Sequence, residues 1–480
     1  MIEGKKELVV SLFWSMGGQI GAMIISLATN VLLARILSPF QFGQVGIIMF
    51  FILISNVLTE SGLGGALVRK LDADYKDFST VFVFNVTLSL LLYIILFFTA
   101  GLIATYYGNP ELEKLLQVSG IVILINSFQV IQNAKLVRAM KFKRKSVYYF
   151  NSVLIGSLVG LILAYNGYGV WSLVFLQITL AFLLTCQLWI FEGAFFSLNF
   201  SKASFSKLFG FGINTTLASI LNTAFDNIYQ LILARTFSIN QVGLFYQGKK
   251  LQDVPNNVIK LSSLNVVYSS LSKHQSNNKI FLQKFQSIVN PLILLCGAIA
   301  LVFLIFSDGI LFLLYGKKWL EAEFYMQVLA VGSFFYLLEM FNRLIFKVYD
   351  KTRSILYLEI LKKGVQLITI FVGLYFRDIK LLIFGFLLTN ILSFFFNYYF
   401  SRRVLGIVDW FGIKRILKVV FSFLLLYVIS DFTFSKSSFL PEEKLFFIPV
   451  VLLGYVFLLR ILNVSNIYAD LKELKSIFRK

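Results

Sequence analysis

The sequence predicts an all-α polytopic membrane protein with about 14 transmembrane helices. Its 480 residues are 58% hydrophobic and only 14% charged, whereas soluble domains carry about 25% charged residues. A helix needs about 20 mostly apolar residues to cross a bilayer, because its backbone polar groups must be satisfied internally. The segment 81–104 meets this requirement without one charged side chain. The composition therefore excludes an ordinary soluble enzyme.

The expected spans follow one another with short connections. The first apolar run, preceded by Lys5 and Lys6, is too long for the core of a signal peptide, so we expect an uncleaved first helix. The eighth span is the most polar, because Lys249, Lys250 and Asp253 interrupt it. The expected spans are 8–34, 42–62, 79–106, 116–134, 147–166, 170–191, 208–234, 243–264, 285–307, 324–346, 355–376, 379–401, 412–431 and 445–464.

Basic residues predict the orientation of these spans. The N-terminus, alternate loops such as 135–145 and 402–418, and the C-terminal tail carry most of the 44 Lys and Arg, whereas acidic residues show no such split. Positive-inside topology then places both termini in the cytoplasm of a bacterial inner (plasma) membrane protein. This topology also explains the net charge of +20, so we expect no nucleic-acid partner. The two basic loops could also contact anionic lipid headgroups.

An internal repeat indicates two related halves. Leu33, Ala34, Arg35, Ser38, Gln41 and Gly43 recur 200 residues later as Leu233, Ala234, Arg235, Ser238, Gln241 and Gly243. Six spans precede the second copy, so both copies have the same orientation in the membrane. We therefore expect two six-helix lobes in a parallel pseudo-two-fold repeat, residues 1–200 and 201–403, followed by helices 13 and 14 and a basic cytoplasmic tail in 404–480.

Polar side chains inside the expected spans mark candidate functional positions, because charge at membrane depth normally faces a cavity or a partner. The hypothesis of a hydrated, cationic substrate path competes with ordinary helix–helix pairing, Glu339 with Arg343 and Lys250 with Asp253. A further stripe, Asn126, Gln129 and Asn133, lies on one face of the fourth span. The substrate-path candidates are Lys249, Lys250, Arg343, Asp226, Asp253, Glu339, Asn222 and Gln230, and the boundary or gate candidates are Arg35, Arg235 and Glu60.

Little in the sequence favours a metal or a cofactor. The chain has two cysteines, Cys186 and Cys296, both within apolar spans, and a single histidine, His274. A disulfide framework, a thiol metal site and a histidine cluster are therefore not expected. The nucleotide-binding pattern Gly-x-x-x-x-Gly-Lys-Ser/Thr is absent from the sequence. We expect no cofactor, and no motif identifies a proton or sodium coupling site.

Several motifs resemble the polysaccharide-biosynthesis branch of the multidrug/oligosaccharidyl-lipid/polysaccharide exporter superfamily. The resemblance runs over about residues 8 to 400 and is greatest to O-antigen, colanic-acid and teichuronic-acid translocases. The segments that carry it are Leu33-Ala34-Arg35 through Ser38-Pro39 to Phe42-Gly43, Glu60 with Gly62-Leu63, Ala66 to Lys70, Asp226-Asn227, Ala234-Arg235, Val242-Gly243 to Tyr246, and Tyr315 to Trp319.

This resemblance implies an ATP-independent flippase of surface polysaccharide or lipopolysaccharide biosynthesis. Its substrate would be an undecaprenyl-diphosphate-linked oligosaccharide, moved from the cytoplasmic to the outer leaflet by alternating access. The implied partners are this polyprenyl-linked substrate, membrane lipid, and a polysaccharide polymerase with glycosyltransferases. Cations such as Lys249, Lys250 and Arg343 would then compensate the diphosphate.

Two other functions are open to the sequence. A multidrug or small-solute cation-coupled antiporter of the same superfamily would favour an acidic cavity, and the intramembrane lysines argue against it. A membrane glycosyltransferase or polymerase would need a longer outside loop or paired carboxylates there, which 307–323 and 431–444 do not provide. The sequence therefore favours a transporter over an enzyme.

Overall fold

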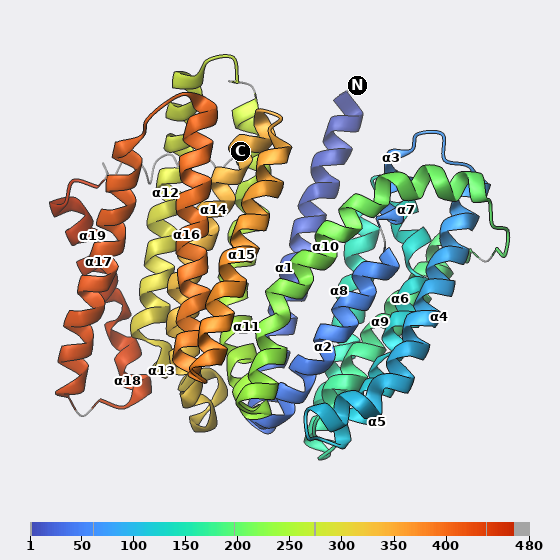
Figure 1. Ribbon diagram of the computed structural model, residues 1–480, viewed down its shortest axis with the longest axis horizontal. Helices are drawn as coiled ribbons and strands as arrows, with labels where there is room; N and C mark the ends of the chain where they lie inside the picture. The colour runs from blue at the N-terminus through green and yellow to red at the C-terminus, as the bar shows by residue number, and fades with distance from the viewer. Residues whose placement is uncertain (1, 61, 196, 273–274, 438, 465–480) are drawn as a thin grey trace. The chain divides into compact units, whose positions relative to one another are not determined.

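The computed structural model describes residues 2–60, 62–195, 197–272, 275–437 and 439–464. His274 and the basic tail 465–480, both used above, lie outside the described residues. The described part of the chain consists of α-helices and short 3-10 turns without β-strands (Figure 1).

Residues Met1–Tyr246 form one compact unit. Helix α8 packs along both α1 and α9, and α10 packs along α2. Small residues allow the close α8–α9 approach, since a Cβ at Gly160 would lie 2.8 Å from a methyl carbon of Leu176. The helices are α1 (Ile2–Ile36), α2 (Pro39–Glu60), α3 (Leu63–Arg69), α4 (Tyr75–Tyr106), α5 (Glu111–Ser119), α6 (Ile121–Ser127), α7 (Val130–Arg138), α8 (Phe142–Tyr165), α9 (Trp171–Glu192), α10 (Lys202–Thr236) and the start of α11 (Ile239–Leu271).

Residues Gln247–Lys480 form the second unit. Helix α14 lies at its centre against α12 and α16, and buried aromatic residues such as Phe334, Phe341 and Phe423 fill the core. Besides the rest of α11, its elements are α12 (Asn278–Ile305), α13 (Ser307–Tyr315), η2 (Lys317–Ala322), α14 (Glu323–Val348), α15 (Thr352–Tyr375), α16 (Ile379–Leu405), α17 (Trp410–Ser435), α18 (Pro441–Lys444), η3 (Leu445–Phe447) and α19 (Ile448–Ile461).

Every expected span coincides with a helix or a short run of helices. In the described part of the chain, 11 helical segments are long and apolar enough to cross a membrane. The other expected spans lie on α10, α11 and α15, which carry more polar and charged residues. The lobe boundaries after residues 200 and 403 stay a prediction.

The two copies of the sequence repeat build the same turn. In each copy a long helix ends, a serine follows, and that hydroxyl accepts a hydrogen bond from a glutamine N–H: Gln41 to Ser38 at 3.4 Å and Gln241 to Ser238 at 3.2 Å.

The glycines of the two turns lie against the opposite copy. A Cβ at Gly43 would lie 1.9 Å from the carbonyl oxygen of Ile239, and a Cβ at Gly243 would lie 1.8 Å from that of Pro39. Both contacts are too short for any side chain. The starts of α2 and α11 therefore cross backbone against backbone.

Candidate functional site

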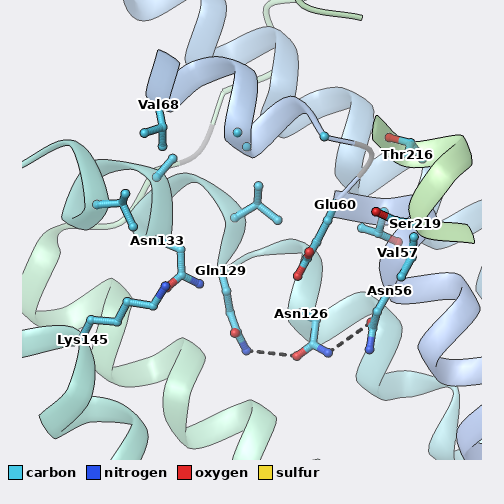
Figure 2. A pocket seen from close by; sticks show the side chains of 17 residues that line it. Asn56, Val57, Glu60, Val68, Asn126, Gln129, Asn133, Lys145, Thr216 and Ser219 are labelled. Carbon is cyan, nitrogen blue, oxygen red and sulfur yellow. Dashed lines mark hydrogen bonds between the residues drawn. The ribbon is translucent and has the colours of Figure 1, made fainter. Parts of the chain in front are cut away.

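A polar cavity of about 520 Å³ lies in the first unit, between α2, α3, α6, α7, α8 and α10 (Figure 2). More than half of the side chains at its wall can form hydrogen bonds, and no aromatic ring is among the described residues that line it. The polar residues of the wall are Asn56, Thr59, Glu60, Asn126, Gln129, Asn133, Lys145, Thr216 and Ser219.

A break in the fourth membrane span creates one side of this cavity. Helix α6 ends at Ser127 and α7 begins at Val130, so Phe128 and Gln129 lie between them. Such interruptions inside a membrane are tolerated where other groups satisfy the freed backbone or where a cavity is lined. Here the indole of Trp189 donates to the carbonyl oxygen of Phe128 at 2.8 Å. The break positions Gln129 at the cavity wall.

A chain of side-chain amides runs from this break across the cavity floor. The Gln129 amide nitrogen donates to the carbonyl oxygen of Ala181, to the Thr185 hydroxyl and to the Asn126 side-chain oxygen, at 3.1, 2.9 and 3.1 Å. The Asn126 amide nitrogen in turn donates to the Asn56 side-chain oxygen at 3.2 Å. These bonds connect α9, α6 and α2 and hold the three amides in fixed orientations.

Three other side chains line the cavity and make no such hydrogen bonds within the described residues. Glu60, the last residue of α2, and Lys145, in the first turn of α8, approach it from opposite sides, with Asn133 beside Lys145 (Figure 2). Within the described residues, no hydrogen bond or ion pair engages these three side chains. Their hydrogen-bonding capacity faces the cavity.

The second unit contains a network of ion pairs between α14 and α15. The Arg343 guanidinium lies 2.5 Å from a Glu339 carboxylate oxygen and also contacts Glu359. The Lys362 ammonium lies 2.9 Å from the other Glu339 oxygen, and the Lys363 ammonium lies 3.5 Å from Glu359. Glu339 is only 1% exposed. Three cations, Arg343, Lys362 and Lys363, thus contact the two carboxylates.

An aromatic residue extends this α14–α15 network towards α11. The Tyr336 ring has the ammonium groups of Lys260 and Lys362 at 4.7 and 5.4 Å from its centroid. Cations are stabilised over the face of such rings. Lys260 therefore adds a further positive charge to the same region.

The structure brings Glu339 and Arg343 together, in agreement with the pairing that their spacing predicts. Sequence reasoning missed Glu359, Lys362 and Lys363, although their i, i+3 and i+4 spacing within the span 355–376 was a usable signal. It also passed over Lys145 as a cavity residue, because that lysine belongs to a loop explained by topology.

The other predicted residues do not gather in the cavity. Of the predicted substrate-path and boundary residues, the cavity contains Glu60 alone among its described lining. In the predicted stripe of α10, Gln230 is buried, Asn222 is half-buried and Asp226 is exposed.

On α11, Lys249, Lys250 and Asp253 are half-buried. Arg35 is exposed, and the Arg235 guanidinium donates to the carbonyl oxygen of Tyr106 at 2.6 Å while lying over its ring.

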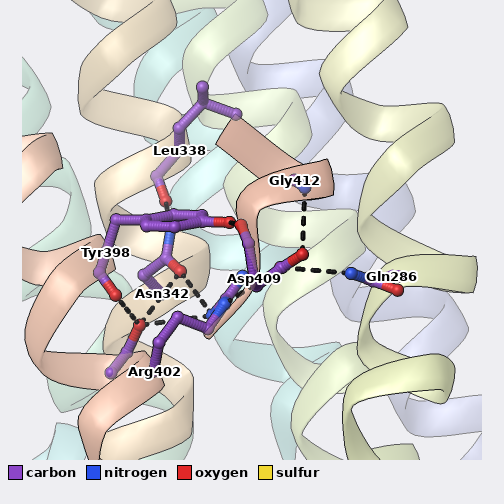
Figure 3. A network of polar contacts seen from close by, with 8 residues as sticks. Gln286, Leu338, Asn342, Tyr398, Arg402, Asp409 and Gly412 are labelled. Atoms are coloured by element: carbon purple, nitrogen blue, oxygen red, sulfur yellow. Dashed lines mark hydrogen bonds and ion pairs between the residues drawn. The ribbon is translucent and has the colours of Figure 1, made fainter. Parts of the chain in front are cut away.

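A third network of polar side chains links α16 to the start of α17 (Figure 3). The Arg402 guanidinium lies 3.2 Å from the Asp409 carboxylate and donates to the Asn342 side-chain oxygen at 3.1 Å. The same carboxylate accepts from Gln286 and from the backbone N–H of Gly412 at the start of α17. Arg402 is 6% exposed, so this member of the basic loop 402–418 is a structural residue instead of a headgroup contact.

Known proteins resemble this chain in sequence. Residues 32–324 match the family described as "Polysaccharide biosynthesis protein". The succinoglycan biosynthesis transport protein ExoT of Rhizobium meliloti (strain 1021) is 22% identical over 328 residues, 68% of this chain and 66% of that protein. The lipopolysaccharide biosynthesis protein WzxC of Escherichia coli (strain K12) is 21% identical over 325 residues, 66% of this chain and 65% of that protein. The chain thus covers just under two thirds of each of these relatives.

Solved structures resemble it in fold. The lipid II flippase MurJ in an inward closed conformation has a TM-score of 0.73 at 16% identity, covering 96% of this chain and 99% of that one. An inward-facing multidrug resistance MATE family transporter of the MOP superfamily has a TM-score of 0.63 at 16% identity, covering 83% and 98%. These neighbours have the 14-helix, two-lobe fold. The predicted fold class is confirmed, and the chain is a multi-pass membrane protein.

Proposed function

Because the chain belongs to the polysaccharide biosynthesis protein family, within the multidrug/oligosaccharidyl-lipid/polysaccharide exporter superfamily, we propose that it is a lipid-linked oligosaccharide flippase. It moves an undecaprenyl-diphosphate-linked repeat unit of a surface polysaccharide from the cytoplasmic to the outer leaflet of the bacterial inner membrane. The headgroup crosses by alternating access while the polyprenyl tail stays in lipid.

The observation that carries this proposal is the group of cations in the α14–α15 network. Arg343, Lys362 and Lys363 lie together around Glu339 and Glu359. A diphosphate offers several anionic oxygens, and guanidinium and ammonium groups bind such oxygens through charge-assisted hydrogen bonds. The network therefore offers cations that can bind the phosphate oxygens of a diphosphate.

The energy source and the topology are parts of the same proposal. Both termini lie in the cytoplasm, and transport uses no ATP and no cofactor. Since the sequence has no phosphate-binding loop, a proton or sodium gradient is the driving force to test. The protein is a transporter and not an enzyme, and it acts between glycosyltransferases that build the repeat unit and a polymerase that consumes it.

A reconstituted transport assay tests this function. The purified protein is placed in liposomes, and leaflet exchange of a short, labelled polyprenyl-diphosphate oligosaccharide is followed with and without imposed gradients. We expect protein-dependent exchange that Lys249→Glu combined with Lys250→Glu abolishes while the protein stays folded. Lys380→Glu, the same substitution at a single exposed lysine, is the control and should exchange as the unmodified protein does.

One result would contradict the proposed function, and another would contradict the role given to Lys249 and Lys250. Absence of exchange under every gradient would exclude this substrate class. Exchange that survives the double charge reversal would remove Lys249 and Lys250 from the path and leave the α14–α15 network as the anion site to test.

A further inference from the structure

We propose that the polar cavity of the first unit is a saccharide-binding site, which holds one pyranose ring of the headgroup between Glu60 and Lys145. This inference rests on the proposed function for the source of the sugar. It assigns the sugar to residues of the first unit. The diphosphate would bind to a different set of residues, the α14–α15 network.

The uncommitted side chains supply the first argument. Glu60 offers two carboxylate oxygens as acceptors, Lys145 offers three N–H donors, and the Asn133 amide offers both kinds of group. No hydrogen bond or ion pair within the described structure uses these side chains. A sugar hydroxyl is at once donor and acceptor, so vicinal hydroxyls can donate to Glu60 and accept from Lys145 and Asn133.

The amide chain supplies the second argument. Gln129, Asn126 and Asn56 are held by bonds to α9, α6 and α2 before any ligand arrives. Groups held in advance lose little freedom when they bind, which improves affinity and selectivity. A fixed row of amides beside a free carboxylate suits a polyhydroxylated ring, whose substituents lie at fixed spacing.

The shape of the cavity supplies the third argument. Its volume of about 520 Å³ lies within the range of about 300–1,000 Å³ that is usual for small-molecule sites. At Gly65 the cavity wall has no side chain, and a Cβ added there would meet no heavy atom within 4 Å. The described lining has no aromatic ring over which a drug cation could stack. The polar wall also does not suit a polyprenyl tail.

The position of the cavity agrees with a loading site. Glu60 ends α2, and Lys145 lies in the first turn of α8 at the end of the basic segment 135–145. Under the predicted orientation both lie near the cytoplasmic face, where the proposed substrate is assembled. The sugar would therefore meet this cavity before it crosses.

Saturation-transfer NMR on the purified full-length protein tests the inference. The probes are the methyl glycosides of glucose, galactose, N-acetylglucosamine and glucuronic acid, each without lipid or phosphate. We expect transfer to at least one of them. Glu60→Gln removes a charged acceptor and should weaken binding by about tenfold or more. Gly65→Phe should abolish binding, because its ring enters the cavity.

A matched control separates cavity filling from general damage. Gly210 is also a helical glycine of the first unit with no heavy atom within 4 Å of an added Cβ, and it does not line the cavity. Gly210→Phe should bind the sugar as the unmodified protein does. Equal binding by Gly65→Phe and Gly210→Phe would place any sugar site elsewhere and overturn the inference.

The remaining outcomes distinguish this inference from the proposed function. No transfer to any probe overturns the saccharide site, and flipping in the liposome assay would then leave the proposed function standing. Sugar binding lost in Gly65→Phe, together with no flipping, supports the site and contradicts the function. If Glu60→Gln stops flipping but leaves sugar binding within about twofold, Glu60 serves coupling and the site as stated is wrong.

Discussion

The polar cavity of the first unit and the α14–α15 network of the second use similar residue types in opposite ways. In the network, Glu339 and Glu359 form ion pairs with Arg343, Lys362 and Lys363. In the cavity, Glu60 and Lys145 face each other without a hydrogen bond or an ion pair in the described structure. The network charges contact one another before any ligand binds, whereas the cavity charges face the space where the proposed sugar would lie.

This contrast has a thermodynamic meaning. Removing one member of a buried ion pair leaves an uncompensated charge and destabilises strongly. Removing a side chain that only faces a cavity changes stability little. The free energy of unfolding and the rate of transport should therefore respond differently in the two regions.

The largest loss of stability is expected for Arg402→Ala, which breaks the buried ion pair with Asp409. This pair is the standard against which the α14–α15 network is compared. The substitution leaves the Asp409 carboxylate without its guanidinium and should destabilise by about 3–5 kcal/mol. Thermal unfolding of the purified protein in detergent measures the loss. The control is Arg403→Ala, because Arg403 is the exposed neighbour on the same helix turn. Equal unfolding midpoints for the two variants would contradict the assignment.

A smaller loss is expected for Arg343→Ala. Two carboxylates lose their shared cation, but Arg343 is 24% exposed, so solvent should limit the destabilisation to about 3 kcal/mol. Adding Glu359→Ala to this variant should restore part of the stability, which a double-mutant cycle measures. If the double variant is as unstable as the sum of the single ones, the residues are not coupled.

Gln129→Ala should destabilise by about 1–2 kcal/mol, because Thr185 and Asn126 lose a buried partner. The same variant should bind the sugar probe more weakly, since the amide chain is released. Thermal unfolding and saturation-transfer NMR on one preparation give both values. A stability loss with unchanged sugar binding would confine Gln129 to a structural role.

The smallest effect on stability is expected for Glu60→Gln, within about 0.5 kcal/mol of the unmodified protein. Leaflet exchange should nevertheless fall by about tenfold or more, because the carboxylate loses its charge at the sugar. The isosteric change Glu321→Gln, at an exposed glutamate of η2, should alter neither property. A large drop in the unfolding midpoint of Glu60→Gln would show that Glu60 holds the fold.

The sequence predicts the membrane architecture well because apolar length and the repeat are local properties of the chain. It also identifies Asn126, Gln129 and Asn133 as one polar face and Glu339 with Arg343 as a pair, since helical spacing places such residues together. Helical spacing says nothing about which helices meet. Lys145 and Glu60 are 85 positions apart and share a cavity only because α8 and α2 fold around the break between α6 and α7.

The crossing of Gly43 and Gly243 restricts how the two copies of the repeat can diverge. After a duplication, one copy can ordinarily drift while the other keeps the ancestral residue. That freedom is absent here, because each glycine contacts the backbone of the other copy. A side-chain substitution in the other copy cannot move that backbone atom away, so both positions must stay glycine. Anyone who divides the protein into two coexpressed fragments should therefore cut after Tyr246 instead of after residue 200, so that both turns are made on the same piece.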